Sequence, residues 1–302
     1  MHILIRREEI ELVPALAGRS AGLTRALLIG GHNGSTHTGL TLIELDDGHV
    51  DSHLHSFETG FYILEGEPTL YLDGNAVRLK PGACGAIPVG TVHAWRSEGP
   101  SRWIEMTAPK PRGEGLPPDT FFIGPAPDGE PEPLDVRDPR NRNLFLLTPS
   151  DMDIDRLKRG ASVDAPTVSA SMATAALAYS GITVKMLVDK RLDAQLHTMF
   201  MVGYQPGAVA HPHDHPFEES YVMLEGNVDV VADDVRYTLR PGDVFWTGVG
   251  CVHAFYEVEG NPVLWLETSA PGPPDQHSYR FSRDWEYLAE RLRDEASIPA
   301  AD

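Results

Sequence analysis

Short apolar segments separated by turn residues fill two long stretches of the chain. In residues 36–107, strand-like segments such as residues 40–45 end at turn signals such as Asp46-Asp47-Gly48. Residues 195–268 repeat this scheme, with Pro241-Gly242 among their turns. Closely spaced short strands bounded by such turns are typical of antiparallel sandwiches and barrels. The pattern therefore predicts an all-β protein.

Three further segments depart from this pattern. Residues 109–139 are crowded with Pro, Gly and Asp and are interpreted as a linker. A short helix is expected to begin with Ser150 as its N-cap and to continue to residue 159. A C-terminal helix is expected over 282–296, where one apolar stripe is formed by Trp285, Leu288 and Leu292. We expect this stripe to pack on the outside of a barrel, and a dimer contact is the alternative.

The two strand-rich stretches are copies of one unit. The segment His53-Leu54-His55-Ser56-Phe57-Glu58-Thr59 recurs as His213-Asp214-His215-Pro216-Phe217-Glu218-Glu219. His93 recurs as His253, and His37 as His197, always at an offset of 160 residues. A duplicated unit of this length predicts two domains, which we place at residues 1–140 and 141–302.

Composition narrows the range of partners and compartments. The formal net charge of −19 opposes binding to nucleic acid or to an anionic membrane, because both require a basic surface. Two cysteines, Cys84 and Cys251, are too few for a disulfide scaffold, and Cys251 is expected to be a packed thiol. No apolar run has the length of a signal-peptide core or a membrane span. We therefore expect a cytoplasmic protein.

The repeated histidines are candidate metal ligands. Alternate residues of a strand share one face, so His213 and His215 point the same way, and His253 joins them from a later strand. Imidazole binds Zn, Fe, Cu and Ni, and the carboxylate of Glu219 shifts the preference towards Mn and Fe. No cysteine lies among these residues, which argues against a closed structural zinc site. We expect one divalent ion in the second copy, Fe or Mn, with Zn, Ni and Cu as alternatives.

The spacing of these residues resembles the two motifs of the cupin family. Gly207-(five residues)-His213-Asp214-His215-(three)-Glu219-(six)-Gly226 is similar to the first motif. Gly242-(five)-Gly248-Val249-Gly250-(two)-His253 is similar to the second. The whole chain resembles a bicupin, which implies two tandem cupin jelly-roll β-barrels with a few short helices. The resemblance also implies the metal ligands of the C-terminal barrel, His213, His215, Glu219 and His253.

The first copy departs from the motif at the fourth ligand. His53, His55 and His93 match, but Thr59 stands where the second copy has its glutamate. Three outcomes stay open: a three-histidine site, a site completed by Glu58, or a barrel retained for structure. Glu58 alternates with the ligand face of its strand, so it would need a β-bulge to reach a metal. A second metal ion in the N-terminal barrel is therefore left open.

Other residues are candidates for the surroundings of the C-terminal site. His197 lies on a strand that could face the cavity, where it would contact substrate or a metal ligand, but a buried, hydrogen-bonded histidine is the preferred interpretation. Met199 and Trp246 are candidates for the apolar pocket wall. His211 has ligand-like spacing to His213 but is assigned to the rim. Glu218 alternates with the ligand face and is expected to be solvated.

The resemblance leaves the reaction open, because cupins include dioxygenases, decarboxylases, hydrolases, isomerases and binding domains. We expect a metal-dependent enzyme that acts on a small-molecule metabolite in the C-terminal barrel, with an Fe(II)-type dioxygenase as the first choice. One alternative is a Mn-dependent hydrolase resembling ureidoglycine aminohydrolases, a likeness that Gly248 supports. Another is a non-catalytic bicupin that binds a metal or ligand. A homodimer also stays open.

Overall fold

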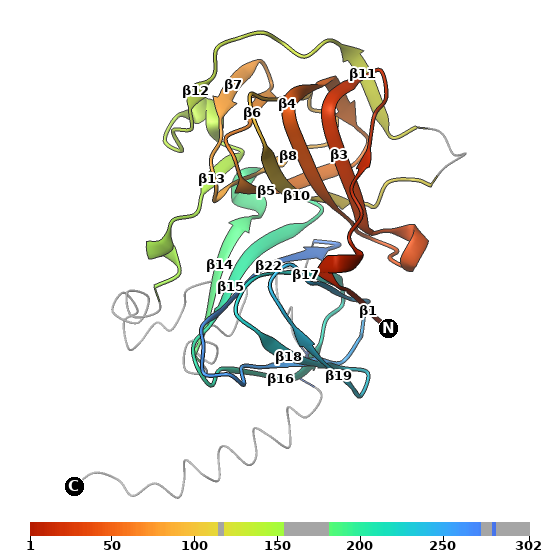
Figure 1. Cartoon of the computed structure of the whole chain (residues 1–302), viewed down its shortest axis with the longest axis vertical. Coiled ribbons are helices and arrows are strands. Elements are labelled where there is room, and N and C mark those ends of the chain that lie inside the picture. Colours follow the sequence, from red (N-terminus) through yellow and green to blue (C-terminus); the bar gives the residue numbers. More distant parts are fainter. Residues whose placement is uncertain (114–117, 154–180, 273–279, 282–302) are drawn as a thin grey trace, which may run out of the picture.

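Two β-barrels lie one above the other in the part of the chain that the structure describes (Figure 1). The computed structural model describes residues 1–113, 118–153, 181–272 and 280–281. In Figure 1 the N-terminal barrel runs from red to yellow, and the C-terminal barrel runs from green to blue with the red segment of residues 2–5 added to it. The prediction of an all-β chain with two tandem barrels is thereby confirmed. The helix expected over 282–296 lies outside the described residues.

The N-terminal barrel is one continuous sheet. Its strands follow the order β12-β7-β6-β9-β4-β10-β5-β8-β13, with β3 and β11 also on β4 and β2 on β3. Its interior is apolar, and the rings of Trp95 and Trp103 stack there with centroids 4.7 Å apart. The strands are β2 (Val13–Pro14), β3 (Ser20–Ile29), β4 (Gly39–His55), β5 (Glu58–Glu65), β6 (Thr69–Leu72), β7 (Asn75–Arg78), β8 (Ala83–Ile87), β9 (His93–Ser97), β10 (Ser101–Ala108), β11 (Thr120–Gly124), β12 (Glu132–Pro133) and β13 (Leu144–Leu146).

The C-terminal barrel is formed by two sheets, ordered β1-β20-β17-β22-β15-β14 and β19-β18-β21-β16-β23. Both sheets contribute to one apolar core that includes Phe245, Phe255 and Trp265. The strands are β1 (His2–Ile5), β14 (Ile182–Val188), β15 (Thr198–Tyr204), β16 (Val209–Asp214), β17 (Glu218–Glu225), β18 (Val228–Ala232), β19 (Val235–Leu239), β20 (Val244–Thr247), β21 (His253–Tyr256), β22 (Val263–Ala270) and β23 (Arg280–Phe281).

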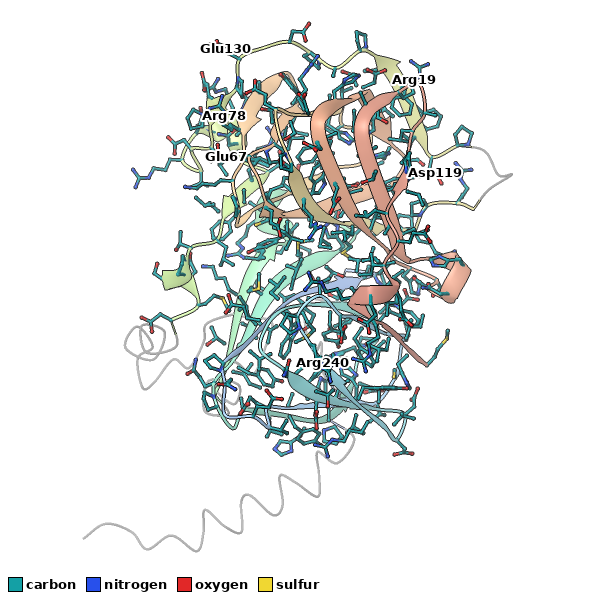
Figure 2. All side chains as sticks on the ribbon, viewed as in Figure 1. Arg19, Glu67, Arg78, Asp119, Glu130 and Arg240 are labelled. Atoms are coloured by element: carbon teal, nitrogen blue, oxygen red, sulfur yellow. The ribbon has the colours of Figure 1, made fainter. Side chains whose placement is uncertain are left out.

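A third apolar layer packs between the two barrels. Strand alternation explains it, because Tyr221 of β17 faces the barrel core while its neighbour Val222 faces this layer. Figure 2 shows side chains filling both barrels and the space between them, whereas labelled charged residues lie around the outside, among them Arg19, Arg78 and Glu130. We call the following residues the inter-barrel layer: Ala26, Leu28, Ile29, Leu40, Tyr62, Cys84, Ala86, Ile104, Met106, Ala108, Leu187, Val188, Ala194, Met199, Met201, Val222, Val244, Trp246, Leu266 and Ala270.

The strand pairing differs from the predicted division at residue 140. β1 pairs with β20 of the C-terminal barrel, with His2 opposite Thr247. Arg6 then forms an ion pair with the buried Asp243, with Nη1 and Oδ2 2.7 Å apart. In the other direction, β13 pairs with β8 of the N-terminal barrel. Each barrel therefore takes in a short segment from beyond the predicted boundary.

The segment predicted as a linker is partly structured. β11 pairs with β4 beside the histidines of the N-terminal barrel, and β12 pairs with β7. Gly and Pro mark turns reliably, but they do not report strand pairing with a distant part of the chain.

The helices among the described residues are short 3-10 turns: η1 (Arg7–Glu9), η2 (Gly31–Asn33), η3 (Pro139–Asn141), η4 (Pro149–Asp151) and η5 (Lys190–Leu192). η4 begins where a longer helix was expected, but its cap is Thr148, which bonds to Asp151, rather than Ser150. Nowhere in the described ranges does a helix have the length and apolar character needed to span a membrane.

Candidate metal centres

Three histidines converge inside the C-terminal barrel. His213 lies at the end of β16, opposite His253 at the start of β21, and His215 follows β16. One ring nitrogen from each lies within 4.8 Å of the others, and all three side chains are buried. A register shift between Ala210 and His213 sets this pairing. The predicted histidine set is therefore brought together by the fold.

Backbone carbonyls fix which nitrogen of two of these rings faces the centre. Nδ1 of His213 lies 2.5 Å from the carbonyl oxygen of His211, and Nδ1 of His253 lies 2.9 Å from that of Cys251. An Nδ1–H that donates to a carbonyl leaves Nε2 as the metal-binding nitrogen. The rings are thus oriented before any ion binds. His211 itself has an exposed side chain, in agreement with its assignment to the rim.

Glu219 lies against two of these histidines. Its Oε2 is 3.0 Å from His215 Nε2 and 3.7 Å from His253 Nε2. Tyr221, two residues further along β17, donates its hydroxyl to the same oxygen at 2.6 Å and lies 2.9 Å from His253 Nε2. All the ligands that the resemblance implied therefore share one buried location.

The electrostatics of this location suit a divalent cation. Burial lowers the pKa of His213 and His253, so these imidazoles are neutral ligands. Burial, together with the neighbouring Glu267, raises the pKa of Glu219, and burial raises that of Glu267 to about 7. Among the described residues neither carboxyl pairs with a lysine or arginine. A cation held by the histidines would supply the missing positive charge.

Aromatic side chains form the wall around the C-terminal histidines. Phe217 stacks on His215 with ring centroids 4.8 Å apart, and Phe255 lies edge-on to His253 at 5.8 Å. Phe255 also contacts Tyr221, at 4.9 Å. The environment of the centre is therefore largely apolar apart from the ligands, Tyr221 and Glu267.

The N-terminal barrel holds a second histidine triad with the same construction. His53, His55 and His93 each place a nitrogen within 4.8 Å of the others. Nδ1 of His53 lies 2.6 Å from the carbonyl oxygen of Asp51, and Nδ1 of His93 lies 3.0 Å from that of Thr91. Burial and the neighbouring His53 lower the pKa of His55 to about 3. This triad is therefore also a set of neutral nitrogen donors.

The strand opposite the N-terminal triad differs from its C-terminal counterpart. Thr59 is buried, and its hydroxyl has no hydrogen-bond partner among the described residues. Phe61 stands at the position of Tyr221, so the phenolic hydroxyl is absent too. Glu105 is the counterpart of Glu267, held by the indole N–H of Trp103 at 2.9 Å. The N-terminal triad therefore has three histidine donors and no adjacent carboxylate on β5.

Of the three options for this triad, completion by Glu58 is wrong, whereas the three-histidine site and the barrel retained for structure stay open. Glu58 turns away and accepts hydrogen bonds from the backbone N–H groups of Gln195 and Leu196, at 2.8 and 2.9 Å. Its Oε1 also lies 2.6 Å from Nδ1 of His197. Gly60 makes room for this ring, because a Cβ there would lie 2.3 Å from His197 Nε2. His197 is thus buried against the other barrel, as the preferred interpretation expected, rather than in the pocket of the C-terminal site.

Glu218 makes the reciprocal contact and is not solvated as expected. It is 2% exposed and accepts bonds from the backbone N–H groups of Thr36 and His37, at 2.7 and 3.1 Å. The hydroxyl of Ser35 donates to it at 2.6 Å. We call Glu58 and Glu218, with the segments 195–197 and 35–38 that they bind, the paired latches. Strand alternation predicted the face of each glutamate correctly but could not show that the other barrel covers it.

The two predicted pocket-wall residues face the wrong way. Met199 and Trp246 belong to the inter-barrel layer, on the strand face opposite to the histidines. Trp246 pairs with Ser220, whereas Glu219 pairs with Thr247.

Several residues near the two triads escaped the sequence reasoning. Tyr221 lies two residues after Glu219 and therefore on the same face of the strand, so strand alternation could have identified it. Glu267 is an acidic residue that directly follows the apolar run of residues 263–266 in its buried strand, a second usable signal. The hydroxyl of Thr120 lies 2.9 Å from His55 Nδ1. Thr120 belongs to the segment interpreted as a linker, and nothing in the sequence pattern indicated this contact. Beside it, Asp119 (Figure 2) accepts from the hydroxyl of Ser56 at 2.7 Å.

Comparison with known proteins agrees with this architecture. Residues 41–107 and 200–269 each match the cupin domain family Cupin_2. A search of curated protein sequences finds no match. The match regions contain the ligand-bearing strands of both barrels.

Similar solved structures are themselves enzymes with this fold. Salicylate 1,2-dioxygenase from Pseudaminobacter salicylatoxidans is 14% identical with a TM-score of 0.61, over 81% of this chain and 75% of that one. Oxalate decarboxylase from Lactobacillus farciminis is 13% identical with a TM-score of 0.61, over 98% and 94%. The Bacillus subtilis oxalate decarboxylase is 13% identical with a TM-score of 0.61, over 98% and 83%. At such identities the likeness establishes the fold, and with a Cupin_2 domain in each barrel the chain is a bicupin.

Proposed function

We propose that this bicupin is a metal-dependent enzyme that acts on a small metabolite in its C-terminal barrel, as an Fe(II)-type dioxygenase. The observation that carries the proposal is the convergence of three neutral histidines with the carboxyl of Glu219 in one buried, aromatic-walled location. Three nitrogens and one carboxylate suit Fe and Mn, and they leave positions of an octahedral ion open to exchangeable ligands.

The surrounding residues support such a centre in distinct ways. When bound, a ferrous ion would supply the one-electron chemistry that reaction with O2 requires. Tyr221 holds the carboxylate of Glu219 in place through its hydroxyl. The rings of Phe217 and Phe255 exclude water from the histidines. The structural likeness to a salicylate 1,2-dioxygenase supports the choice of oxygen chemistry.

A second candidate function is decarboxylation of a small carboxylic acid. It is favoured by the oxalate decarboxylases, whose alignments extend over 98% of this chain. The two functions share a metal centre but differ in their need for O2 as an oxidant. They can therefore be separated by measuring gas exchange.

The test begins with metal content, measured by inorganic mass spectrometry on the wild type, Glu219→Ala and His93→Ala. We expect Fe or Mn to be lost with Glu219→Ala and retained in His93→Ala. Protein reconstituted with Fe(II) or Mn(II) is then offered salicylate-type aromatic acids and oxalate-type diacids under air and under argon. Substrate-dependent O2 consumption that His253→Ala abolishes, and that His53→Ala reduces less, is the expected result.

Other outcomes would redirect the assignment. Release of CO2 at equal rates under air and argon would favour the decarboxylase. Release of ammonia from a ureido acid, again insensitive to air, would favour the aminohydrolase alternative. Equal loss of activity in His53→Ala and His253→Ala would contradict a single catalytic barrel. No metal after supplementation would leave the non-catalytic binding function.

A further inference from the structure

A third group of potential ligands lies on the C-terminal barrel, away from both triads. The side chains are those of His2, Asp233 and Cys251, and one ligand atom from each lies within 4.8 Å of the others. His2 Nδ1 is 3.1 Å from Asp233 Oδ2. These residues come from three separate parts of the sequence: β1, the turn between β18 and β19, and the turn that leads into β21.

Backbone hydrogen bonds hold these three segments in register. The N–H of Gly248 donates to the carbonyl of Met1 at 2.9 Å, next to the pairing of His2 with Thr247. The N–H of Cys251 donates to the carbonyl of Gly248 at 3.0 Å, and that of Asp233 to Val252 at 3.2 Å. The backbone positions from which the three donor side chains extend are therefore fixed relative to one another. The site is built into the sheet framework, as a preorganised metal site requires.

We propose that His2, Asp233 and Cys251 form a binding site for a zinc-class divalent cation, distinct from the two histidine centres. Thiolate, imidazole and carboxylate are all zinc ligands, and the sulfur selects this class over Mg, Ca and Mn. Three protein ligands leave the fourth tetrahedral position to another donor.

The surroundings fit this assignment. Cys251 is buried whereas the side chain of Asp233 is 43% exposed, so an ion can enter from the side of the carboxylate. The ammonium of Met1 lies 2.8 Å from the same carboxylate, so a cation that binds here must take its place. His2 Nε2 lies 3.0 Å from the hydroxyl of Tyr237, the kind of outer contact that orients a ligating imidazole.

Cys84 provides a matched control within the chain. It is the other cysteine of the sequence, and it is completely buried in the inter-barrel layer. Its thiol lies 3.7 Å from the carbonyl of Phe145. It belongs to none of the three candidate ligand groups among the described residues. Any signal of metal–thiolate bonding can therefore be assigned by comparing two cysteine variants.

The experiment is titration of the full-length, metal-free protein with Co(II), followed by near-ultraviolet absorption. Thiolate-to-cobalt charge transfer reports this site alone, because neither histidine triad contains a sulfur ligand. We expect the band in the wild type and in Cys84→Ser, its loss in Cys251→Ser, and its weakening in His2→Ala. Zn(II) should displace the cobalt and remove the band. Far-ultraviolet circular dichroism checks that each variant is folded.

Two results would overturn the proposal: no band in the wild type at saturating Co(II), or a band that persists in Cys251→Ser. If Cys251→Ser does not fold, the decision passes to His2→Ala and Asp233→Asn, and an undiminished band in both contradicts the site. This readout does not involve turnover, so it is independent of the proposed enzymatic function.

Discussion

Two residue differences separate the histidine triads. Glu219 and Tyr221 of the C-terminal barrel are replaced by Thr59 and Phe61 in the N-terminal barrel, while the histidines occupy equivalent positions and contact backbone carbonyls at equivalent places. Because Tyr221 donates to Glu219 while its hydroxyl oxygen lies 2.9 Å from His253 Nε2, it couples the fourth ligand to the histidines. The polar character of the C-terminal triad therefore depends on two side chains of one strand.

Replacement of Tyr221 by Phe tests this coupling. Phe61 shows that a phenyl ring fits the equivalent position, so we expect Tyr221→Phe to fold normally. Loss of an orienting contact of this kind weakens metal binding by about 10–100-fold. Metal affinity is measured by competition with a chromogenic chelator. Tyr71→Phe, which removes a hydroxyl bonded to the carbonyl of Gly129, is the control and should leave the affinity unchanged.

The paired latches connect the barrels at the scale of elements. Each latch joins the first residue of a strand, β5 or β17, to the segment preceding β15 or β4 of the other barrel. Both segments offer backbone N–H groups to the buried carboxyl of a glutamate from the other barrel. The latches therefore fix the relative position of the barrels through polar contacts, next to the apolar inter-barrel layer.

Glu218→Gln should destabilise the protein. An amide keeps one acceptor oxygen but turns an NH2 group towards other donors, including the N–H of Thr36 and the hydroxyl of Ser35. We expect the free energy of unfolding to fall by about 2–3 kcal/mol, measured by urea denaturation. Glu225→Gln, on the exposed end of the same strand, should have no effect. An equal loss in both variants would contradict the latch.

The latches also predict acid sensitivity. Burial alone would raise the pKa of Glu58 and Glu218, but the hydrogen bonds they accept lower it below the usual 4.5. Carboxyls of this kind bind fewer protons when folded than when unfolded, so their contribution is complete above pH 4.5 and is lost as the pH falls through the lowered values. Urea denaturation of the Glu58→Gln/Glu218→Gln variant across this range should show a shallower loss than the wild type. Parallel curves would contradict this origin.

At the scale of the whole molecule, the inter-barrel layer makes the two barrels depend on each other. Trp246 is 1% exposed in this layer. Trp246→Ala should lower the free energy of unfolding by about 3–5 kcal/mol, because it leaves a cavity. Hydrogen exchange should rise in peptides from both β5 and β17, whereas Val249→Ala, at an exposed position, should change neither. Faster exchange in β17 alone would mean that the barrels are energetically separate.

The sequence predicted those features that depend on local pattern and on the repeat. Alternation and turn residues indicated the strands, and the constant offset located both histidine triads and Glu219. It failed where burial depends on the other copy, as for Glu218, Met199 and Trp246. Strand alternation assigns a side chain to one face of a strand, but it does not show which part of the protein covers that face. The same limit hid β11, whose partner lies far away in sequence.

The pairing of β1 with β20 bears on how the chain folds during its synthesis. The strands of the N-terminal barrel lie between Val13 and Leu146, so all of them are translated before the remaining strands of the second barrel. β1 precedes all of them, yet its partner is among the last strands to be translated. It can therefore dock only after β20 has been synthesised. Closure over so great a sequence separation is intrinsically slow, which makes this edge the expected last step of assembly.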